Sequence, residues 1–445
     1  MNTWAIGQVD GLEDPGMVRV ARVLGGCVSF FTVVGVAAAW LAAVVFAEGI
    51  TTGLDAWGQT VWVENKTPIF YLLHGCALGS LLLAGGIGAV HGGYARLDTA
   101  GRWAVWVMVF SSLLWTLVAY DWGEILSPAV LGATGPFVWL STFLLFAGME
   151  PSVWPRLGRL LDVLVVATAV LAVRSACRSN SHSDAGVYVT NQYFCLLFWY
   201  GGWRCLSRDY RSQAWILADA GFLALLGVLA LWLQRRSWII DTVLLVGLYV
   251  ASIPRRTGAG GRRHTTLLLA AAAIALPVLA ITLLAAPVAG EALAGLQDRL
   301  RDDTRTEQYR MFFSQVSPAD LVLGLGPKAT YYFGPTRAEY QYFDNAYLWM
   351  AFIGGLPILV SYCVLIVRPG LAALLGRRGN HPHVLASGGL LCIWALVLAG
   401  LGVFSSPSLS AYSYFICLMA GLCHRGYATG DPDGVDPDGP WGQEA

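Results

Sequence analysis

Residues 345–367 read NAYLWMAFIGGLPILVSYCVLIV, a run that contains no Asp, Glu, Lys or Arg. Roughly 20 consecutive apolar residues in a helix are enough to cross the hydrocarbon core of a bilayer. Runs of this kind recur along the chain, so that 56% of its 445 residues are hydrophobic and only 13% are charged. Soluble proteins carry about 25% charged residues. The sequence therefore predicts an all-α, polytopic integral membrane protein.

The hydrophobic runs predict about 12 transmembrane helices. In chain order they cover residues 22–49, 68–93, 103–120, 133–149, 160–174, 191–205, 214–234, 237–253, 266–287, 345–367, 384–404 and 411–424. They divide the chain into nine helices within 1–287, a large polar loop at 288–343, three helices within 344–424 and a disordered cytoplasmic tail at 425–445.

Arginines in the short connections indicate the orientation, because Lys and Arg in short loops stay cytoplasmic. With the predicted helices, one side collects Arg19, Arg22, Arg96, Arg102, Arg156, Arg159, Arg208, Arg211, Arg255, Arg256, Arg262, Arg263, Arg368, Arg377 and Arg378. We therefore expect both termini in the cytoplasm and the loop 288–343 outside. Three expected outer places also carry cations: the turn with Arg235 and Arg236, the connection with Arg174 and Arg178, and the large loop.

The large loop combines a charged helix with aromatic segments. Seven Phe and Tyr lie between residues 331 and 347, and disordered segments are poor in aromatic residues, so we expect the loop to be ordered. Its segment 297–316 predicts a helix whose packed face carries, at helical spacing, Arg305, Tyr309, Phe312, Phe313 and Val316. The motif LGLGP at 323–327 has glycines for tight turns but lacks the order of a nucleotide phosphate loop.

The outer cations and aromatic residues favour a lipid diphosphate and sugars as ligands. Guanidinium groups bind phosphate oxygens bidentately, and aromatic rings offer flat faces to sugar rings. Asp344 stands where a helix is expected to begin after the loop. It can act as a general base toward a hydroxyl, or it can be the N-cap of that helix, and the sequence leaves both open. Pairing of the loop cations with acidic neighbours such as Glu307 is the structural alternative for those cations.

Three segments resemble the O-antigen ligase and polysaccharide polymerase superfamily: TRTEQYRMFFSQV, LGLGP and FDNAYLWMAFIGGLPIL. In that family an Arg-bearing helix precedes a glycine-rich turn, and a His-Asn or Asp-Asn pair opens a helix with paired glycines. The residues that match this pattern are Arg305, Gly324, Gly326, Asp344, Asn345, Tyr347, Leu348, Gly354 and Gly355. QRRSWIIDTVLL resembles the family's Ser-Arg turn with Arg236 in the matching place, and YVTNQY around Asn191 is similar to an outer segment of the family.

The resemblance implies a GT-C-type glycosyltransferase fold with its active site at the periplasmic face of the bacterial inner membrane. It implies inverting transfer without metal or cofactor, and partners that are undecaprenyl-diphosphate-linked oligosaccharide donor and acceptor, membrane lipids and a chain-length-determining co-polymerase. Taken with the outer cations and aromatic residues, it predicts Arg305, Asp344 and Arg236 as catalytic residues. The predicted substrate-binding residues are Arg310, Asn345, Tyr347, Lys328, Asn191, Arg174 and Tyr332.

Asp344 stands where ligases of this family typically carry His, which favours a polysaccharide polymerase over a ligase. Ligase-type transfer of a glycan to a lipid or protein acceptor remains the alternative within the class. A flippase or transporter of lipid-linked oligosaccharides is the alternative from another class, since transporters carry ionisable residues near the bilayer midplane. Asp219 and His74 are the candidates for such residues. The net charge of zero gives no argument for nucleic acid as a partner.

Overall fold

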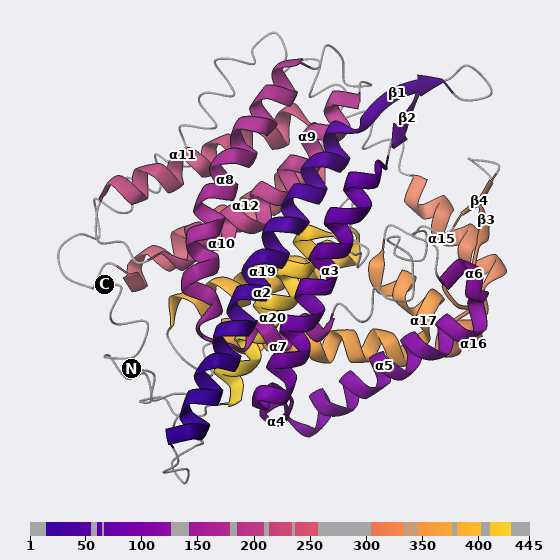
Figure 1. Ribbon diagram of the computed structural model, residues 1–445. Coiled ribbons are helices and arrows are strands. Elements are labelled where there is room, and N and C mark those ends of the chain that lie inside the picture. The colour runs from indigo at the N-terminus through magenta and orange to yellow at the C-terminus, as the bar shows by residue number, and fades with distance from the viewer. Residues whose placement is uncertain are drawn as a thin grey trace.

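A computed structural model describes residues 15–54, 60–64, 66–125, 142–178, 185–208, 213–233, 236–256, 304–333, 338–340, 345–375, 381–401 and 410–428. Helices dominate these stretches (Figure 1). Seven of the helical segments there are long and apolar enough to cross a membrane. The prediction of an all-α membrane protein is therefore confirmed, whereas the number of 12 spans stays a prediction.

The seven segments are built around α2 (Pro15–Glu48), α3 (Pro68–Gly88), α5 (Thr99–Ala119), α8 (Val153–Arg178), α11 (Gln213–Trp232), α17 (Ala346–Tyr362) and α19 (Pro382–Leu396). Three of them are lengthened by further helical turns. These extensions are η1 (Ala89–Gly93) with α4 (Tyr94–Arg96), η6 (Cys363–Val367) with α18 (Arg368–Leu374), and η7 (Val397–Leu401). Helix α12 (Arg236–Arg256) contains a shorter apolar stretch, Ser237–Ser252.

The remaining predicted spans are helical as far as the structure describes them. Residues 185–207 form α9 (Ala185–Leu196), η4 (Leu197–Gly201) and α10 (Gly202–Ser207) in continuous order. The span expected at 133–149 is represented by α7 (Leu144–Gly148), and the last span by α20 (Ala411–Ala428). The span expected at 266–287 lies outside the described residues, as does the tail 429–445.

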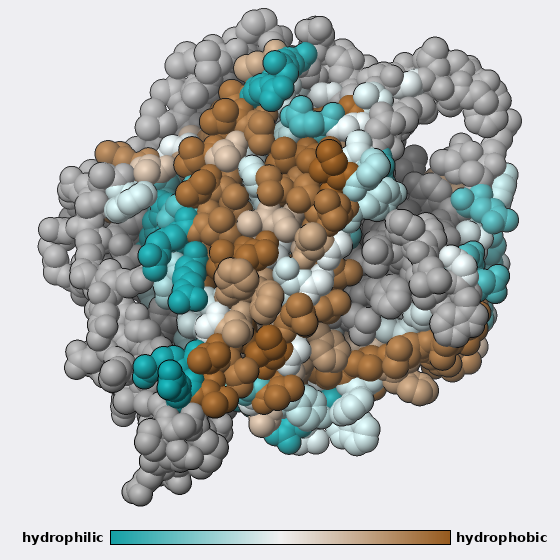
Figure 2. Space-filling view, in the orientation of Figure 1, coloured by the Kyte–Doolittle hydropathy of each residue, from teal (hydrophilic) through white to brown (hydrophobic). Residues whose placement is uncertain are grey.

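Hydrophobic side chains cover much of the outside of the helix bundle. Phe30, Leu72, Phe110, Leu117 and Val163 are each more than half exposed, although all are large and apolar. This apolar surface extends over α2, α3 and α5 in Figure 2. A lipid bilayer accounts for it, because lipid tails solvate apolar side chains whereas water does not.

The centre of the bundle depends on small residues that let helices approach closely. Gly148 at the end of α7 faces the backbone of Leu418 in α20, and Gly421 in α20 faces the backbone of Leu145 in α7. A side chain at either glycine would collide with the opposite backbone. Close contact through glycine is typical of helix pairs in membranes. Residues 411–424 of α20 are all buried, so this helix is the core of the described bundle.

The large polar loop contains regular structure. It holds α15 (Thr304–Gln315), α16 (Pro318–Leu323) and an antiparallel hairpin of β3 (Tyr331–Phe333) and β4 (Ala338–Tyr340). These elements gather beside α17 and α6 (Trp122–Ile125), at the right of Figure 1. A second hairpin, which the sequence did not predict, joins β1 (Ile50–Leu54) to β2 (Thr60–Glu64) between α2 and α3.

The face of α15 that packs inward differs from the expected one. Phe312 and Val316 are buried and Tyr309 is half-buried, as predicted, but Phe313 is 55% exposed. Gln308 is buried in its place. Gln308 and Phe312 are one turn apart and so lie on one side of the helix, whereas Phe313 points about 100° away from Phe312.

Candidate functional site

The motif LGLGP binds to α17 at a break in that helix. Pro357 has no backbone N–H, so it cannot donate to the carbonyl of Ile353 one turn earlier. The N–H of Gly326 donates to this carbonyl instead, at 2.9 Å, and the N–H of Leu325 donates to the neighbouring carbonyl of Phe352 at 2.8 Å. The glycine-rich turn therefore satisfies the carbonyl of Ile353, which Pro357 leaves without a helical partner, and that of Phe352 beside the non-helical backbone of Gly355.

Three glycines at this contact adopt a conformation that other residues avoid. The φ angles are +79° at Gly324, +90° at Gly326 and +78° at Gly355. A Cβ atom on Gly324 would lie 2.5 Å from the backbone nitrogen of Gly355, and one on Gly326 would lie 2.8 Å from the ring of Trp115 in α5. The glycines that carry the family resemblance thus lock the polar loop onto α17 and α5.

Helix α15 is fixed to the same place by aromatic contacts. The ring of Phe312 lies 5.3 Å from that of Tyr331 in β3 and 5.2 Å from that of Phe352 in α17, in both cases edge to face. The side-chain nitrogen of Gln308 donates to the hydroxyl of Tyr331 at 2.7 Å. Helix α15, strand β3 and helix α17 consequently form one packed unit, which we call the loop unit.

The helix α17 begins with a cap provided by Asn345. Its side-chain oxygen accepts a hydrogen bond from the N–H of Leu348 at 3.1 Å, which is the bond expected of an N-cap residue. The alternative in which Asp344 is the N-cap is therefore wrong. Asp344 itself lies outside the described residues, and so its role as a base stays a prediction.

The two predicted catalytic arginines stand at helix starts. Arg305 is the second residue of α15, and Arg236 is the first residue of α12; the side chains of both lie outside the described part of the structure. Gln308 and Phe312, three and seven positions after Arg305, are buried in the loop unit. Residues at this spacing share a helix face.

Asn191 joins α9 to α12. Its side chain is fully buried, and its oxygen accepts a hydrogen bond from the indole N–H of Trp238 at 2.6 Å. Trp238 in turn packs on Phe194, with ring centroids 4.7 Å apart. Since Trp238 follows Arg236 by two residues, this bond fixes the start of α12.

Arg174 belongs to a polar group at the ends of α2, α8 and α9. Its guanidinium lies 3.8 Å from the carboxylate of Glu48, which also accepts a hydrogen bond from the hydroxyl of Tyr193 at 2.9 Å. Nearby, the hydroxyl of Thr190 donates to Ser175 at 2.9 Å. Arg174 is thus linked through Glu48 to Tyr193 in α9, two residues after Asn191.

The two described cations of the polar loop pair with carboxylates. The ammonium of Lys328 lies 2.8 Å from Glu124 in α6 and 4.8 Å from the ring of Tyr120. Hydrogen bonding from Lys328 lowers the pKa of Glu124. Arg310 pairs with Glu307 at 2.7 Å on the exposed side of α15, as in the structural alternative for these cations. Exposed ion pairs contribute at most about 1 kcal/mol, so both cations can exchange their partner for a phosphate.

The two predicted substrate-binding tyrosines differ in their surroundings. Tyr332 in β3 is 51% exposed, and its backbone exchanges two hydrogen bonds with the side chain of Gln315, both at 2.8 Å. Its ring is accordingly available to a ligand. The hydroxyl of Tyr347 donates to the carbonyl of Ala395 in α19 at 2.9 Å, so Tyr347 attaches α17 to α19.

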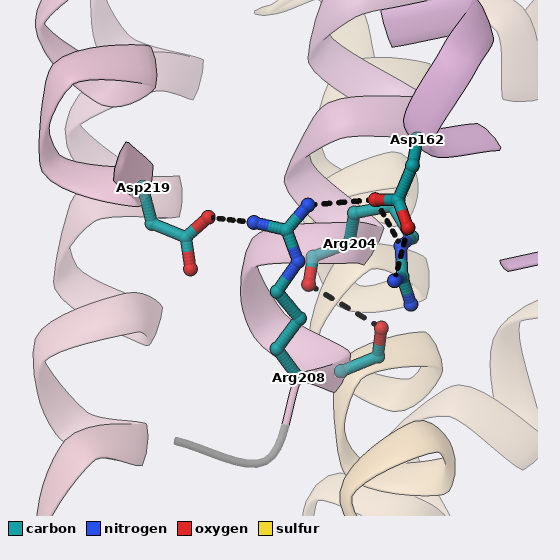
Figure 3. A network of polar contacts seen from close by, with 5 residues as sticks. Asp162, Arg204, Arg208 and Asp219 are labelled. Atoms are coloured by element: carbon teal, nitrogen blue, oxygen red, sulfur yellow. Dashed lines mark hydrogen bonds and ion pairs between the residues drawn. The ribbon is translucent and has the colours of Figure 1, made fainter. Parts of the chain in front are cut away.

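Asp219, one of the two ionisable residues that would support a transporter function, is part of an ion-pair network. Arg208 donates to Asp219 at 2.7 Å and to Asp162 at 2.6 Å, and Arg204 donates to Asp162 through two nitrogens, at 2.9 and 2.7 Å (Figure 3). The four charges balance and join α8, α10 and α11. His74, the second candidate, is buried and stacks on Phe70 at 5.5 Å.

Sequence reasoning missed several residues that hold the site together. Gln308 and Trp238 lie inside the segments that carry the resemblance, and Tyr331 is one of the aromatic residues of the loop, but no structural role was predicted for any of the three. Glu48 and Glu124 lie far along the chain from the cations they bind. Among the described residues, no group of His, Cys, Asp and Glu is arranged to hold a metal ion.

The arrangement brings the predicted residues into two groups. The loop unit holds the helix start after Asp344 and the helix that carries Arg305, while Asn191, Arg174 and the start of α12 form a second group around α9. Helices α12 and α17 both contact η7, which lies between them in the packing.

Comparison of the chain with protein-family models, with curated proteins and with solved structures gave no match.

Proposed function

We propose that this protein is a membrane glycosyltransferase that polymerises oligosaccharide repeat units linked to undecaprenyl diphosphate. On this proposal it belongs to the O-antigen ligase and polysaccharide polymerase superfamily, has a GT-C-type fold with 12 membrane spans, and works at the periplasmic face of the bacterial inner membrane. The observation that supports this best is the binding of LGLGP to the broken helix α17. This contact gives a physical reason for the glycines and the order of segments on which the resemblance rests.

The proposed reaction is a single displacement. A hydroxyl of the acceptor sugar attacks the anomeric carbon of the donor sugar, and a new C–O bond forms as the bond from that carbon to the diphosphate breaks. The hydroxyl proton passes to the carboxylate of Asp344, and undecaprenyl diphosphate leaves with its negative charge. Attack from the face opposite the leaving group inverts the configuration at the anomeric carbon.

The roles of the arginines follow from the charge of the leaving group. Diphosphate gains negative charge as the bond breaks, and guanidinium groups stabilise such charge with paired hydrogen bonds. Arg305 and Arg236 are assigned this role. Arg310, Lys328 and Arg174 bind more distant phosphate or sugar oxygens, while Asn345 and Tyr347 order the helix behind Asp344. Tyr332 offers an exposed ring to a sugar.

The test is polymer synthesis from purified components. The protein is reconstituted in liposomes with lipid-linked repeat units from its native host, and the products are separated by gel and by mass. We expect a ladder of polymers with the wild-type protein. Asp344→Asn should lower the rate by about 10²–10⁴-fold, because general-base assistance contributes that much. Asp320→Asn is the matched control, since Asp320 is an exposed carboxylate of the same loop that hydrogen-bonds Ser317.

Each outcome of this test discriminates between functions. A single transfer to an added lipid acceptor, without a ladder, would identify a ligase. Movement of the lipid-linked unit across the bilayer without any new glycosidic bond would identify a transporter and overturn the proposal. Equal rates for wild type and Asp344→Asn would refute the role of Asp344 as the base while leaving the polymerase reaction in place.

A further inference from the structure

Asp241 in the second turn of α12 is a buried carboxyl group. Its exposed fraction is 0%, and neither of its oxygens has a hydrogen-bond partner in the described structure. Asp219 is equally buried, at 1% exposure, but it pairs with Arg208 at 2.7 Å. Both acids lie within apolar stretches of the chain, but within the described residues only Asp219 has a counter-ion that compensates the cost of burying a charge.

The surroundings of Asp241 are apolar or neutral. It shares the inner face of α12 with Trp238, Thr242, Leu245 and Tyr249, all of them buried. The hydroxyl of Thr242 donates to the carbonyl of Trp238 at 2.6 Å and is thereby engaged within the helix. None of these four side chains carries a charge.

Among the described residues, the elements packed against α12 offer Asp241 no hydrogen-bond partner. Helix α11 contains one titratable side chain, Asp219, which pairs with Arg208, and residues 397–401 of η7 contain none. In α9 the titratable groups are Tyr188, Cys195 and Tyr193, which donates to Glu48; α10 has Cys205 and Arg204, which pairs with Asp162; α19 has His383 and Cys392. Arg236 lies five positions before Asp241 on its own helix, with its side chain outside the described structure.

An isolated carboxylate in such a place is strongly unfavourable. Transfer of an ionised group into a medium of low dielectric constant costs several kcal/mol or more unless a counter-ion or hydrogen-bond donors compensate it. A neutral carboxylic acid avoids most of this cost. An ionisable residue inside a membrane protein usually has a functional role, because an apolar residue at the same position would allow the same fold at a lower cost in free energy.

We propose that Asp241 is a proton-binding site, whose carboxyl group carries its proton at neutral pH. The proton is the ligand, and its loss would place a negative charge one helical turn from Trp238, whose indole N–H donates to Asn191 in α9. This site is separate from the glycosyl transfer proposed above, and it stands or falls independently of that reaction.

The proposal sets the sign of a pH effect. In the unfolded chain Asp241 meets water and releases its proton at acidic pH, whereas the folded chain retains it. The unfolded state then binds fewer protons than the folded state, so stability falls as the pH rises. Asp241→Asn is neutral at every pH and nearly the same shape, and it should lose less stability than the wild type when the pH is raised from about 5 to about 8.

Infrared spectroscopy tests the proton directly. A protonated carboxyl group has a C=O stretch that a carboxylate lacks, and labelling of aspartate with ¹³C assigns the band to Asp. We expect the full-length protein in detergent at neutral pH to show such a band, and Asp241→Asn to lose it. Asp320→Asn removes an exposed aspartate that is hydrogen-bonded by Ser317, and it should leave the band unchanged.

Two results would overturn the proposal. One is a wild-type spectrum at neutral pH without a protonated aspartate band, accompanied by such a band in Arg236→Gln, because Arg236 would then be the counter-ion of an ionised Asp241. The other is a band that survives in Asp241→Asn, because the proton would then belong to another aspartate. Should Asp241→Asn fail to fold, Arg236→Gln together with the wild-type spectrum still decides between the acid and the ion pair.

Discussion

Replacing Gly355 by alanine should destabilise the protein through the contact between α17 and the polar loop. The backbone at Gly355 has φ +78° and ψ 173° inside α17, a region that essentially only glycine occupies. A Cβ atom there would lie 2.7 Å from the carbonyl carbon and oxygen of Leu323 and 2.7 Å from the carbonyl oxygen of Val322. These are backbone atoms at the end of α16, so they cannot rotate out of the way.

The expected magnitude follows from these two effects. A residue held in such a conformation costs about 1–3 kcal/mol, and an extra carbon in a close-packed contact costs about 1–3 kcal/mol more. The sum of about 2–6 kcal/mol is a large part of the 5–15 kcal/mol that stabilise typical proteins. In an ordinary helix the same change has the opposite sign, because alanine is favoured over glycine by about 1 kcal/mol.

The measurement is the thermal unfolding midpoint of the purified protein in detergent, with size-exclusion chromatography to verify that each variant is monodisperse. Gly79→Ala in α3 is the matched control, because a Cβ atom on Gly79 has nothing within 4 Å. We expect Gly355→Ala to melt well below the wild type and Gly79→Ala to melt at or above it. A midpoint for Gly355→Ala equal to that of Gly79→Ala would refute the view that these glycines lock the loop.

Two further predictions concern ion pairs on other helices. Arg208→Gln removes the charge that pairs with the buried carboxylate of Asp219, and we expect a loss of roughly 3–5 kcal/mol; adding Asp219→Asn should restore part of the melting temperature, and no restoration would contradict the pairing. A hydrogen bond from Arg368 lowers the pKa of Asp98, which caps α5. Its stabilising effect is therefore present at neutral pH and lost as the pH falls through the lowered pKa, so the melting advantage of wild type over Asp98→Asn should shrink in acid.

The class of fold could be predicted from the sequence because it depends on composition along the chain. Apolar runs such as 345–367 are long enough to span a bilayer whatever they pack against, and the structure has α17 and its extension there. Runs at 191–205 and 411–424 are helical too, but their lengths fall near the limit. The number of spans depends on such marginal segments, and a local pattern does not decide them.

The contacts of the site could not be predicted, because they join residues that are far apart in the chain. The glycines of LGLGP were expected to make tight turns, yet the reason for their order lies in α17. Pro357 leaves the carbonyl of Ile353 without a helical donor, and the N–H of Gly326 donates to it instead. Likewise, the expected inner face of α15 included Phe313, whereas Gln308 is buried because Tyr331 offers it a hydrogen bond. Helical spacing alone ranks Phe above Gln for burial.

The position of the cap changes what a substitution at residue 344 can reveal. If Asp344 were the N-cap, loss of activity after its replacement could reflect fraying of α17 as well as loss of a base. Asn345 makes the capping bond to Leu348, so the cap remains in place in Asp344→Asn. A replacement that leaves the melting temperature unchanged and removes activity then measures the carboxylate alone. The two adjacent residues therefore have separate tests, because Asn345 caps the helix while the proposed base is Asp344.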